Sequence, residues 1–226
     1  MNATLRTALA VAGCACAALP ALAAPRLINA CQAITEPGSY VVNRNLQATG
    51  DCLVIAADFV TIDLDGFVIS GSGVGNGVGS ADLVDRRSIN VRNGVITGFA
   101  TGVYLEYASD VTVERVTASA NTNNGIVVGN YSSVRASQAV TNGGTGIRVA
   151  IGGNVNGNTV ARNGLNGIST VEGASVLNNV SRNNGRNGVV MDCPGLFMGN
   201  TASNNVMQNF VDISGGCVVD EHNSTL

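Results

Sequence analysis

The sequence predicts an all-β solenoid, a single-stranded parallel β-helix with about seven to eight coils and capped ends. Three sets of residues recur with one period of 21 over five units, and this shared period is the main reason for the prediction. In the first set, each residue is directly followed by an apolar residue. Its members are Gly125, Gly146, Gly167, Gly188 and Asn209. Apolar residues twelve positions earlier are Val113, Val134, Val155, Val176 and Phe197. Asparagines in the same register are Asn121, Asn142, Asn163, Asn184 and Asn205.

A period of 21 residues is also the length of a leucine-rich repeat, which needs a Leu-x-x-Leu-x-Leu framework. Residues 110–215 contain only three leucines, and valine and isoleucine fill the apolar positions instead. Each unit holds short β-type runs and no helical periodicity. We therefore expect one coil per repeat, with equivalent residues stacked about 4.8 Å apart. Stacked asparagines are expected to hydrogen-bond to one another and to tolerate the left-handed backbone of a bend.

The register extends toward the N-terminus with one insertion. Ile62-x-Leu64 aligns with Ile89-x-Val91, and residues 68–71 align with residues 95–98, both at a shift of 27. This shift exceeds the regular period of 21, which predicts a glycine-rich loop within residues 70–88.

Four cysteines follow the N-terminal segment, and an even number in an exported chain predicts two disulfides. Cys31 and Cys52 are 21 residues apart, so stacking places them within bonding reach. We expect Cys31–Cys52 to join the first coils and Cys193–Cys217 the last. Zinc binding is the alternative, but the chain has no Cys-x-x-Cys pair, and no metal site is expected.

The first 23 residues have the pattern of a secretory signal peptide, with Arg6, an apolar stretch and Ala21-Leu22-Ala23 at the cleavage site. Residues 24–226 then form the β-helix domain. An alternative is a lipoprotein signal that leaves a lipidated Cys14. No other segment is long and apolar enough to span a bilayer. We expect a secreted or periplasmic protein, or one anchored through Cys14.

The composition argues against several functions. The chain has no lysine, and residues 24–226 carry 11 arginines against 15 acidic residues, so nucleic-acid binding is not expected. His222 is the only histidine, which argues against Ser-His-Asp or Cys-His catalysis. Without histidine clusters, transition-metal binding is also not expected.

Several motifs resemble those of bacterial right-handed β-helix repeat proteins of the pectate-lyase-like superfamily. They are Gly38-Ser39-Tyr40, Gly50-Asp51-Cys52, the segment 60–67 and the Asn-x-x-x-Gly-Ile/Val units. The resemblance covers about residues 30–217 and implies a right-handed parallel β-helix. The superfamily includes polysaccharide lyases, glycoside hydrolases, uronate epimerases and non-catalytic members, and the fold does not choose among them. It implies no cofactor, except Ca²⁺ if the protein is a lyase.

One column of charged residues is a candidate catalytic site. The residue after each inward Leu or Val is Asp65, Arg92, Glu114 or Arg135 in four successive coils, so the signs alternate. One interpretation is a surface ladder of ion pairs, each contributing about 0.2–1 kcal/mol. The other is a saccharide site, with Asp65 and Glu114 as acids and an arginine as base or carboxylate clamp.

Two further groups are candidate substrate-binding residues. One is the end of the predicted loop, with Asp82, Asp85, Arg86 and Arg87. The other is Tyr104 and Arg148, with Glu106 and Tyr107 close by in sequence. Tyr104 and Arg148 share a column but lie two coils apart, so we do not expect them to be adjacent.

These observations favour an exported β-helix that binds or modifies a polysaccharide, without a recognisable catalytic set. The alternatives are a non-catalytic structural or interaction scaffold, and a polysaccharide lyase or glycoside hydrolase. A groove along the charged column would favour catalysis, and a convex face with closed ion pairs would favour a scaffold.

Overall fold

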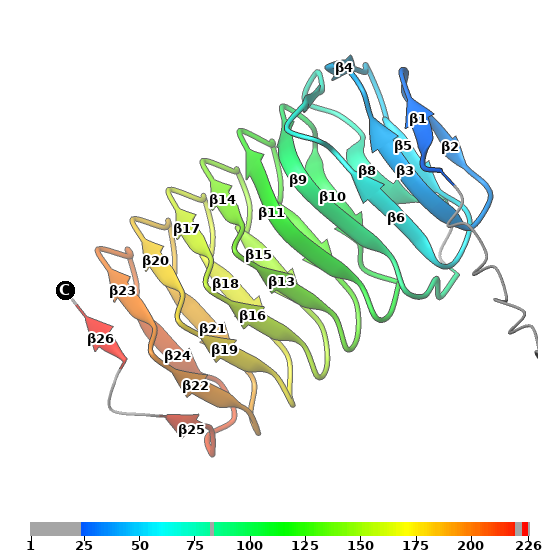
Figure 1. Ribbon diagram of the computed structural model, residues 1–226. Coiled ribbons are helices and arrows are strands. Elements are labelled where there is room, and N and C mark those ends of the chain that lie inside the picture. Colours follow the sequence, from blue (N-terminus) through cyan, green and yellow to red (C-terminus); the bar gives the residue numbers. More distant parts are fainter. Residues whose placement is uncertain (1–23, 82–83, 220–222, 226) are drawn as a thin grey trace, which may run out of the picture.

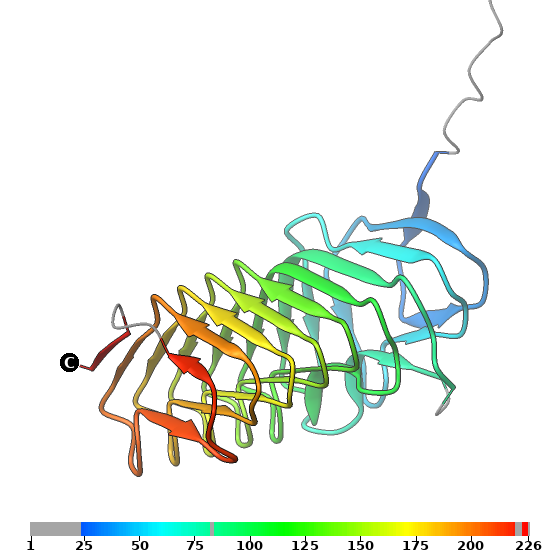
Figure 2. The ribbon, with the colours of Figure 1, turned by 90° about the horizontal axis from the view of Figure 1, so that it is seen from below.

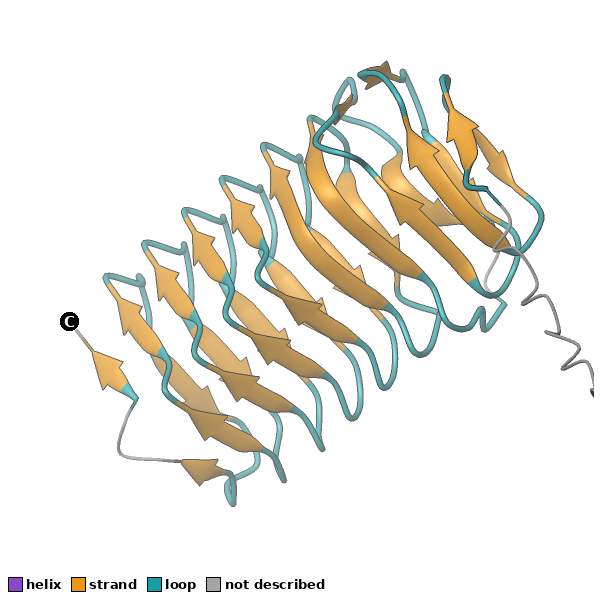
Figure 3. Ribbon diagram, viewed as in Figure 1, coloured by secondary structure: helices purple, strands orange, loops and turns teal. Residues whose placement is uncertain are grey.

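A computed structural model describes residues 24–81, 84–219 and 223–225. These residues form 26 strands and no helix, and every strand pairing is parallel (Figure 3). The strands build a solenoid in which successive coils stack along one axis from the N-terminal to the C-terminal end (Figures 1 and 2). The expected signal peptide at 1–23, with Cys14, lies outside the described residues.

Each coil contributes strands to three parallel ladders. The first contains β1 (Arg26–Ile28), β3 (Gly38–Val42), β6 (Val60–Asp63), β9 (Asn90–Thr97), β11 (Thr112–Ser119), β13 (Ser133–Arg135), β16 (Asn154–Asn156), β19 (Ser175–Leu177), β22 (Leu196–Met198) and β25 (Val218–Val219). The second contains β4 (Leu46–Gln47), β7 (Val68–Ser70), the later halves of β9 and β11, β14 (Gln138–Val140), β17 (Thr159–Ala161), β20 (Val180–Arg182), β23 (Thr201–Ser203) and β26 (Ser224–Thr225).

The third ladder forms a sheet of its own with nine strands. They are β2 (Gln32–Ile34), β5 (Leu53–Ile55), β8 (Asn76–Ser80), β10 (Thr101–Leu105), β12 (Ile126–Val128), β15 (Ile147–Val149), β18 (Ile168–Thr170), β21 (Val189–Met191) and β24 (Phe210–Asp212). The described residues thus form about nine coils, more than the seven to eight expected. The caps expected at the two ends stay a prediction, because residues 1–23 and 220–222 lie outside the described part.

The predicted apolar columns form the core. Val113, Val134, Val155 and Val176 are stacked on one another in the first ladder, and Ile126, Ile147 and Ile168 in the third. All of these side chains are fully buried. No single coil could bury its inner face alone, so the stacking supplies the hydrophobic stabilisation of the fold.

The predicted asparagine ladder is confirmed. Each amide from Asn121 to Asn184 donates through Nδ2 to the Oδ1 of the next asparagine at 2.9–3.0 Å, and all four of these donors are buried. Sequence analysis missed a second ladder of Asn158, Asn179, Asn200 and Asn223, with Nδ2–Oδ1 distances of 3.0 Å. Both ladders satisfy buried polar groups at bends between strands.

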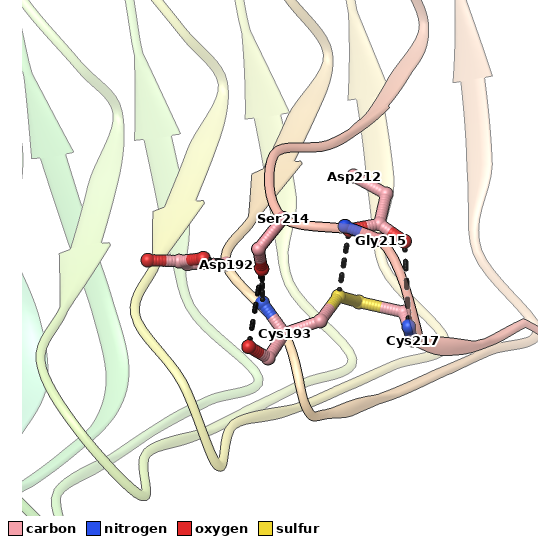
Figure 4. The surroundings of a disulfide bond; sticks show 6 residues. All are labelled: Asp192, Cys193, Asp212, Ser214, Gly215 and Cys217. Atoms are coloured by element: carbon pink, nitrogen blue, oxygen red, sulfur yellow. Dashed lines mark hydrogen bonds between the residues drawn. A yellow bond between two sulfur atoms is a disulfide. The ribbon is translucent and has the colours of Figure 1, made fainter.

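Both predicted disulfides are present. Cys31–Cys52 joins the coils of β2 and β5 with a Cα–Cα distance of 4.4 Å, and Cys193–Cys217 joins the last coils at 5.1 Å. Figure 4 shows the second bond beside Asp212, whose carboxylate accepts hydrogen bonds from the backbone N–H groups of Gly215 and Cys217. That carboxylate therefore holds the turn that carries Cys217 against the preceding coil.

Candidate functional site

The charged column exists, but its first member is Asp63 and not Asp65. Strand β6 pairs with β9 so that Asp63 faces Arg92, a shift of 29, whereas β7 pairs with β9 at the predicted shift of 27. The turn between β6 and β7 holds two residues more than the corresponding segment of β9, and these displace the register. Asp65 lies in this turn with a left-handed φ of 46°, and its N–H donates to Asp63 Oδ1.

Closed ion pairs fill this column. Asp63 Oδ2 lies 2.9 Å from Arg92 Nε, and Glu114 Oε2 lies 2.9 Å from Arg135 Nη2. Glu114 also pairs with Arg115. The hydrogen bond from Arg135 is the main cause that lowers the pKa of Glu114. These groups satisfy one another, which favours the ion-pair ladder over a catalytic site.

An open groove lies elsewhere, where the end of the predicted loop meets the turn after β10. It has a volume of about 540 Å³. Its lining residues are Asp85, Arg87, Glu106, Tyr107, Ala108, Ser109, Asp110, Asn130 and Tyr131. The structure thus brings Asp85 and Arg87 of the predicted loop end next to Glu106 and Tyr107. Tyr104, Arg148 and the charged column do not line the groove.

The loop end is held to the turn by hydrogen bonds. Ser109 Oγ donates to Asp85 Oδ1 at 2.7 Å, and the Ser109 N–H donates to the carbonyl of Arg86 at 2.8 Å. Arg87 forms an isolated parallel bridge with Ser109. Arg86 is half-buried and does not line the groove. The fourth predicted residue of this group, Asp82, lies outside the described residues.

Tyr104 and Arg148 are two coils apart, as expected, but Glu106 connects them. The Tyr104 hydroxyl donates to Glu106 Oε2 at 2.7 Å, and Arg148 Nη1 lies 2.7 Å from Glu106 Oε1. Burial and the hydrogen bond to Glu106 raise the pKa of Tyr104 to about 12. Both Glu106 oxygens are therefore occupied, and these contacts fix Glu106, which is the member of the cluster that lines the groove.

Sequence analysis missed Asp110, Asn130 and Tyr131 as groove residues. A signal for two of them was available, since Asp110 and Tyr131 are followed at intervals of 21 by Gly152 and Gly173. All four residues have left-handed φ angles of 55–76°. A polar and an aromatic side chain at positions that favour glycine are unusual and mark this corner of the coil.

The described residues contain few groups of side chains that could together bind a metal ion. Among them, one group of three ligand-type side chains lies within 4.8 Å, namely Cys193, Asp212 and Cys217. Its two sulfurs form a disulfide, so only the Asp212 carboxylate remains. Ca²⁺ takes 6–8 oxygen ligands, which this group does not supply. An apolar hollow of about 180 Å³ lies beside it at the C-terminal end, lined mainly by Met191, Phe197 and Phe210.

The ladders, the stacked core and the surface groove define a β-solenoid with a candidate ligand site on its side. A protein-family profile for the right-handed β-helix region matches residues 29–179. The chain belongs to this family of right-handed β-helix proteins. No curated protein matches the chain.

Solved structures share the fold. The A-module of the mannuronan C-5 epimerase AlgE6 of Azotobacter vinelandii has a TM-score of 0.62 and 22% identity, over 74% of this chain and 51% of that one. The enzymatically active domain of bacteriophage CBA120 tailspike protein 2 has a TM-score of 0.59 and 14% identity, over 83% of this chain and 35% of that one. The chain thus spans about half or less of these two structures. At such identities the similarity shows the fold alone.

Two observations concern the environment of the protein. Two disulfides indicate an oxidising compartment. Within the described ranges, no helix is long and apolar enough to cross a membrane.

Proposed function

We propose that this exported β-helix protein binds a polysaccharide in the groove between Asp85 and Tyr131. The observation that carries the proposal is the groove itself, which combines two tyrosines with carboxylate, guanidinium, hydroxyl and amide groups. Concave sites with apolar faces and a few convergent polar groups are the usual form of a ligand site.

The side chains suit a sugar. Tyr107 and Tyr131 are 44% and 67% exposed, and each offers a flat ring with a hydroxyl at its edge. The carboxylates of Asp85 and Asp110 accept hydrogen bonds from hydroxyl groups, and Arg87 and Asn130 donate them. Tyr104 and Arg148 hold the Glu106 carboxylate of the groove in place before the ligand arrives, which lowers the cost of ordering on binding.

A scaffold role is the second candidate function. It is favoured by the charged column, where Asp63, Arg92, Glu114 and Arg135 form ion pairs with one another. In that case the ladder stabilises a display surface, and the groove has no glycan ligand.

The test is retardation of the disulfide-bonded protein in native gels that contain neutral or acidic polysaccharides, with and without Ca²⁺. We expect retardation by at least one glycan, its loss in Tyr107→Ala and its retention in Arg135→Ala. New reducing ends or unsaturated uronate in the same incubations would show that the protein also cleaves its ligand. Migration that no glycan changes, with the fold intact by circular dichroism, would overturn the proposal in favour of the scaffold.

A further inference from the structure

One corner of the solenoid carries two large aromatic side chains on a left-handed backbone. The strand registers place Phe59, Ser88, Asp110 and Tyr131 at equivalent positions of four successive coils. Each of these residues has a φ of 55°. The next two coils have Gly152 and Gly173 at this position, with φ angles of 66° and 76°.

The two aromatic residues are not explained by folding. A bulky side chain disfavours the left-handed region, whereas glycine adopts it readily. Phe59 and Tyr131 are 65% and 67% exposed, so they gain little from burial. A strained residue that contributes little to the core points to a functional constraint on its side chain.

Tyr131 lines the groove, and Phe59 adjoins it through its backbone. The Phe59 N–H donates to the carbonyl of Arg87, which is a groove residue. Phe59 and Tyr131 are three coils apart, so about 14 Å separates their backbones. A Cβ on Gly152 would lie 2.8 Å from Tyr131 Cδ1 and 3.0 Å from Cε1, so this edge of the ring packs against the glycine while most of the side chain is exposed. Two exposed rings at this separation suit a linear ligand that runs along the solenoid axis.

The charges of the groove narrow the class of ligand. Glu106 is neutralised by Arg148, and Arg87 Nη2 lies 3.5 Å from Asp85 Oδ2. The Asp110 carboxylate, between the two aromatic residues, has no hydrogen-bond or ion-pair partner among the described residues. One negative charge therefore remains uncompensated in the groove, and the whole chain has a net charge of −3. This potential repels a polyuronate and attracts hydrogen-bond donors without negative charge.

We propose that this corner binds a linear polysaccharide that has no carboxylate groups. Its sugar rings stack on Phe59 and Tyr131, and its hydroxyl or amino groups donate hydrogen bonds to Asp110. This inference rests on the proposed function and specifies its ligand. The proposed ligand differs in charge from the substrate of the epimerase with the same fold, whose name gives the polyuronate mannuronan as its substrate.

The test measures the affinity of the disulfide-bonded protein for three probes by titration calorimetry: a neutral glucan, a chitosan oligosaccharide and an oligouronate. We expect binding to the neutral or the amino probe, and at least tenfold weaker binding to the uronate. Added salt should weaken the binding of chitosan and leave the binding of the glucan nearly unchanged. This difference distinguishes a charged amino donor from a neutral hydroxyl donor. Phe59→Asn and Tyr131→Asn should each weaken binding about tenfold without a loss of thermal stability, since asparagine tolerates this backbone.

Matched controls separate the inference from the proposed function. Asp110→Asn should weaken binding, whereas Glu172→Gln, on the same corner two coils beyond Asn130, should not. Leu165→Ala removes an exposed apolar side chain elsewhere and should have no effect. Preferred binding of the uronate, strengthened by Asp110→Asn and lost in Tyr107→Ala, would overturn this inference and leave the proposed function intact. Binding that neither aromatic substitution changes would also overturn it, and no binding of any probe would overturn both.

Discussion

Arg148 forms an ion pair with Glu106 across an intervening strand, with 2.7 Å between Nη1 and Oε1. Val127 lies between Tyr104 and Arg148 in the register, since it pairs with Tyr104 on one side and Arg148 on the other. Val127 is only 1% exposed, although it is not part of the core cluster. The ion pair therefore covers an outward-facing valine, and it fixes Glu106 where the Tyr104 hydroxyl can donate to it.

The cluster of Tyr104, Glu106 and Arg148 should make the free energy of unfolding depend on pH in the alkaline range. The pKa of Tyr104 is raised from 10.0 to about 12 by burial and by Glu106. Between these two values the unfolded chain has lost the Tyr104 proton and the folded chain retains it, so the free energy of unfolding falls as the pH rises. Urea unfolding between pH 9 and about 12 should show this decrease, and Tyr104→Phe should flatten it. An unchanged slope in Tyr104→Phe would show that the hydroxyl titrates normally.

Asp63 should contribute to stability at the acid end. Burial raises its pKa, but hydrogen bonds from Asn93, the Asp65 N–H and Arg92 outweigh this effect, so the net pKa is lowered from 3.8. A lowered folded pKa gives stability that is present above the unfolded value and is lost as the pH falls through the folded value. We expect Asp63→Asn to be less stable than the wild type at pH 6 and to lose less stability on acidification. Asp65→Asn is the matched control, and an equal effect of both substitutions would contradict the register.

The buried amide ladder predicts a large effect of one substitution. Asn163 accepts from Asn142 and donates to Asn184 Oδ1 and to the carbonyl of Ala139. Asn163→Ala leaves these buried groups without partners, which should reduce the free energy of unfolding by about 3 kcal/mol. Asn154→Ala, on the outer face of β16, should change it by less than about 0.5 kcal/mol. Chemical denaturation measures the free energy of unfolding of both variants. An equal decrease in both would mean that the ladder adds no stability.

The period of 21 was enough to predict the coil, the apolar columns, the first asparagine ladder and the Cys31–Cys52 disulfide, because each depends on equivalent residues of stacked coils. Cys193 and Cys217 are 24 residues apart, and their pairing was predicted because they were the two remaining cysteines near the C-terminal end. The position of Asp65 next to Arg92 was predicted wrongly, because two additional residues between β6 and β7 shift the register within a single coil and place Asp63 there instead. The groove was not predicted as a unit. Asp85 and Tyr131 are brought together by a loop that folds back on the turn after β10, and periodicity contains no information on where an insertion folds.

The central claim is that the ligand lies in the groove and contacts its tyrosines. The most direct measurement is nitration of tyrosine by tetranitromethane, followed by mass spectrometry, with and without a polysaccharide that retards the protein. Tyr107 and Tyr131 are exposed groove residues, whereas Tyr40 is buried in the core and serves as the internal reference. We predict that the polysaccharide protects both Tyr107 and Tyr131 from nitration. Retardation with equal nitration of these two residues in the presence and absence of the polysaccharide would contradict the claim and place the ligand elsewhere.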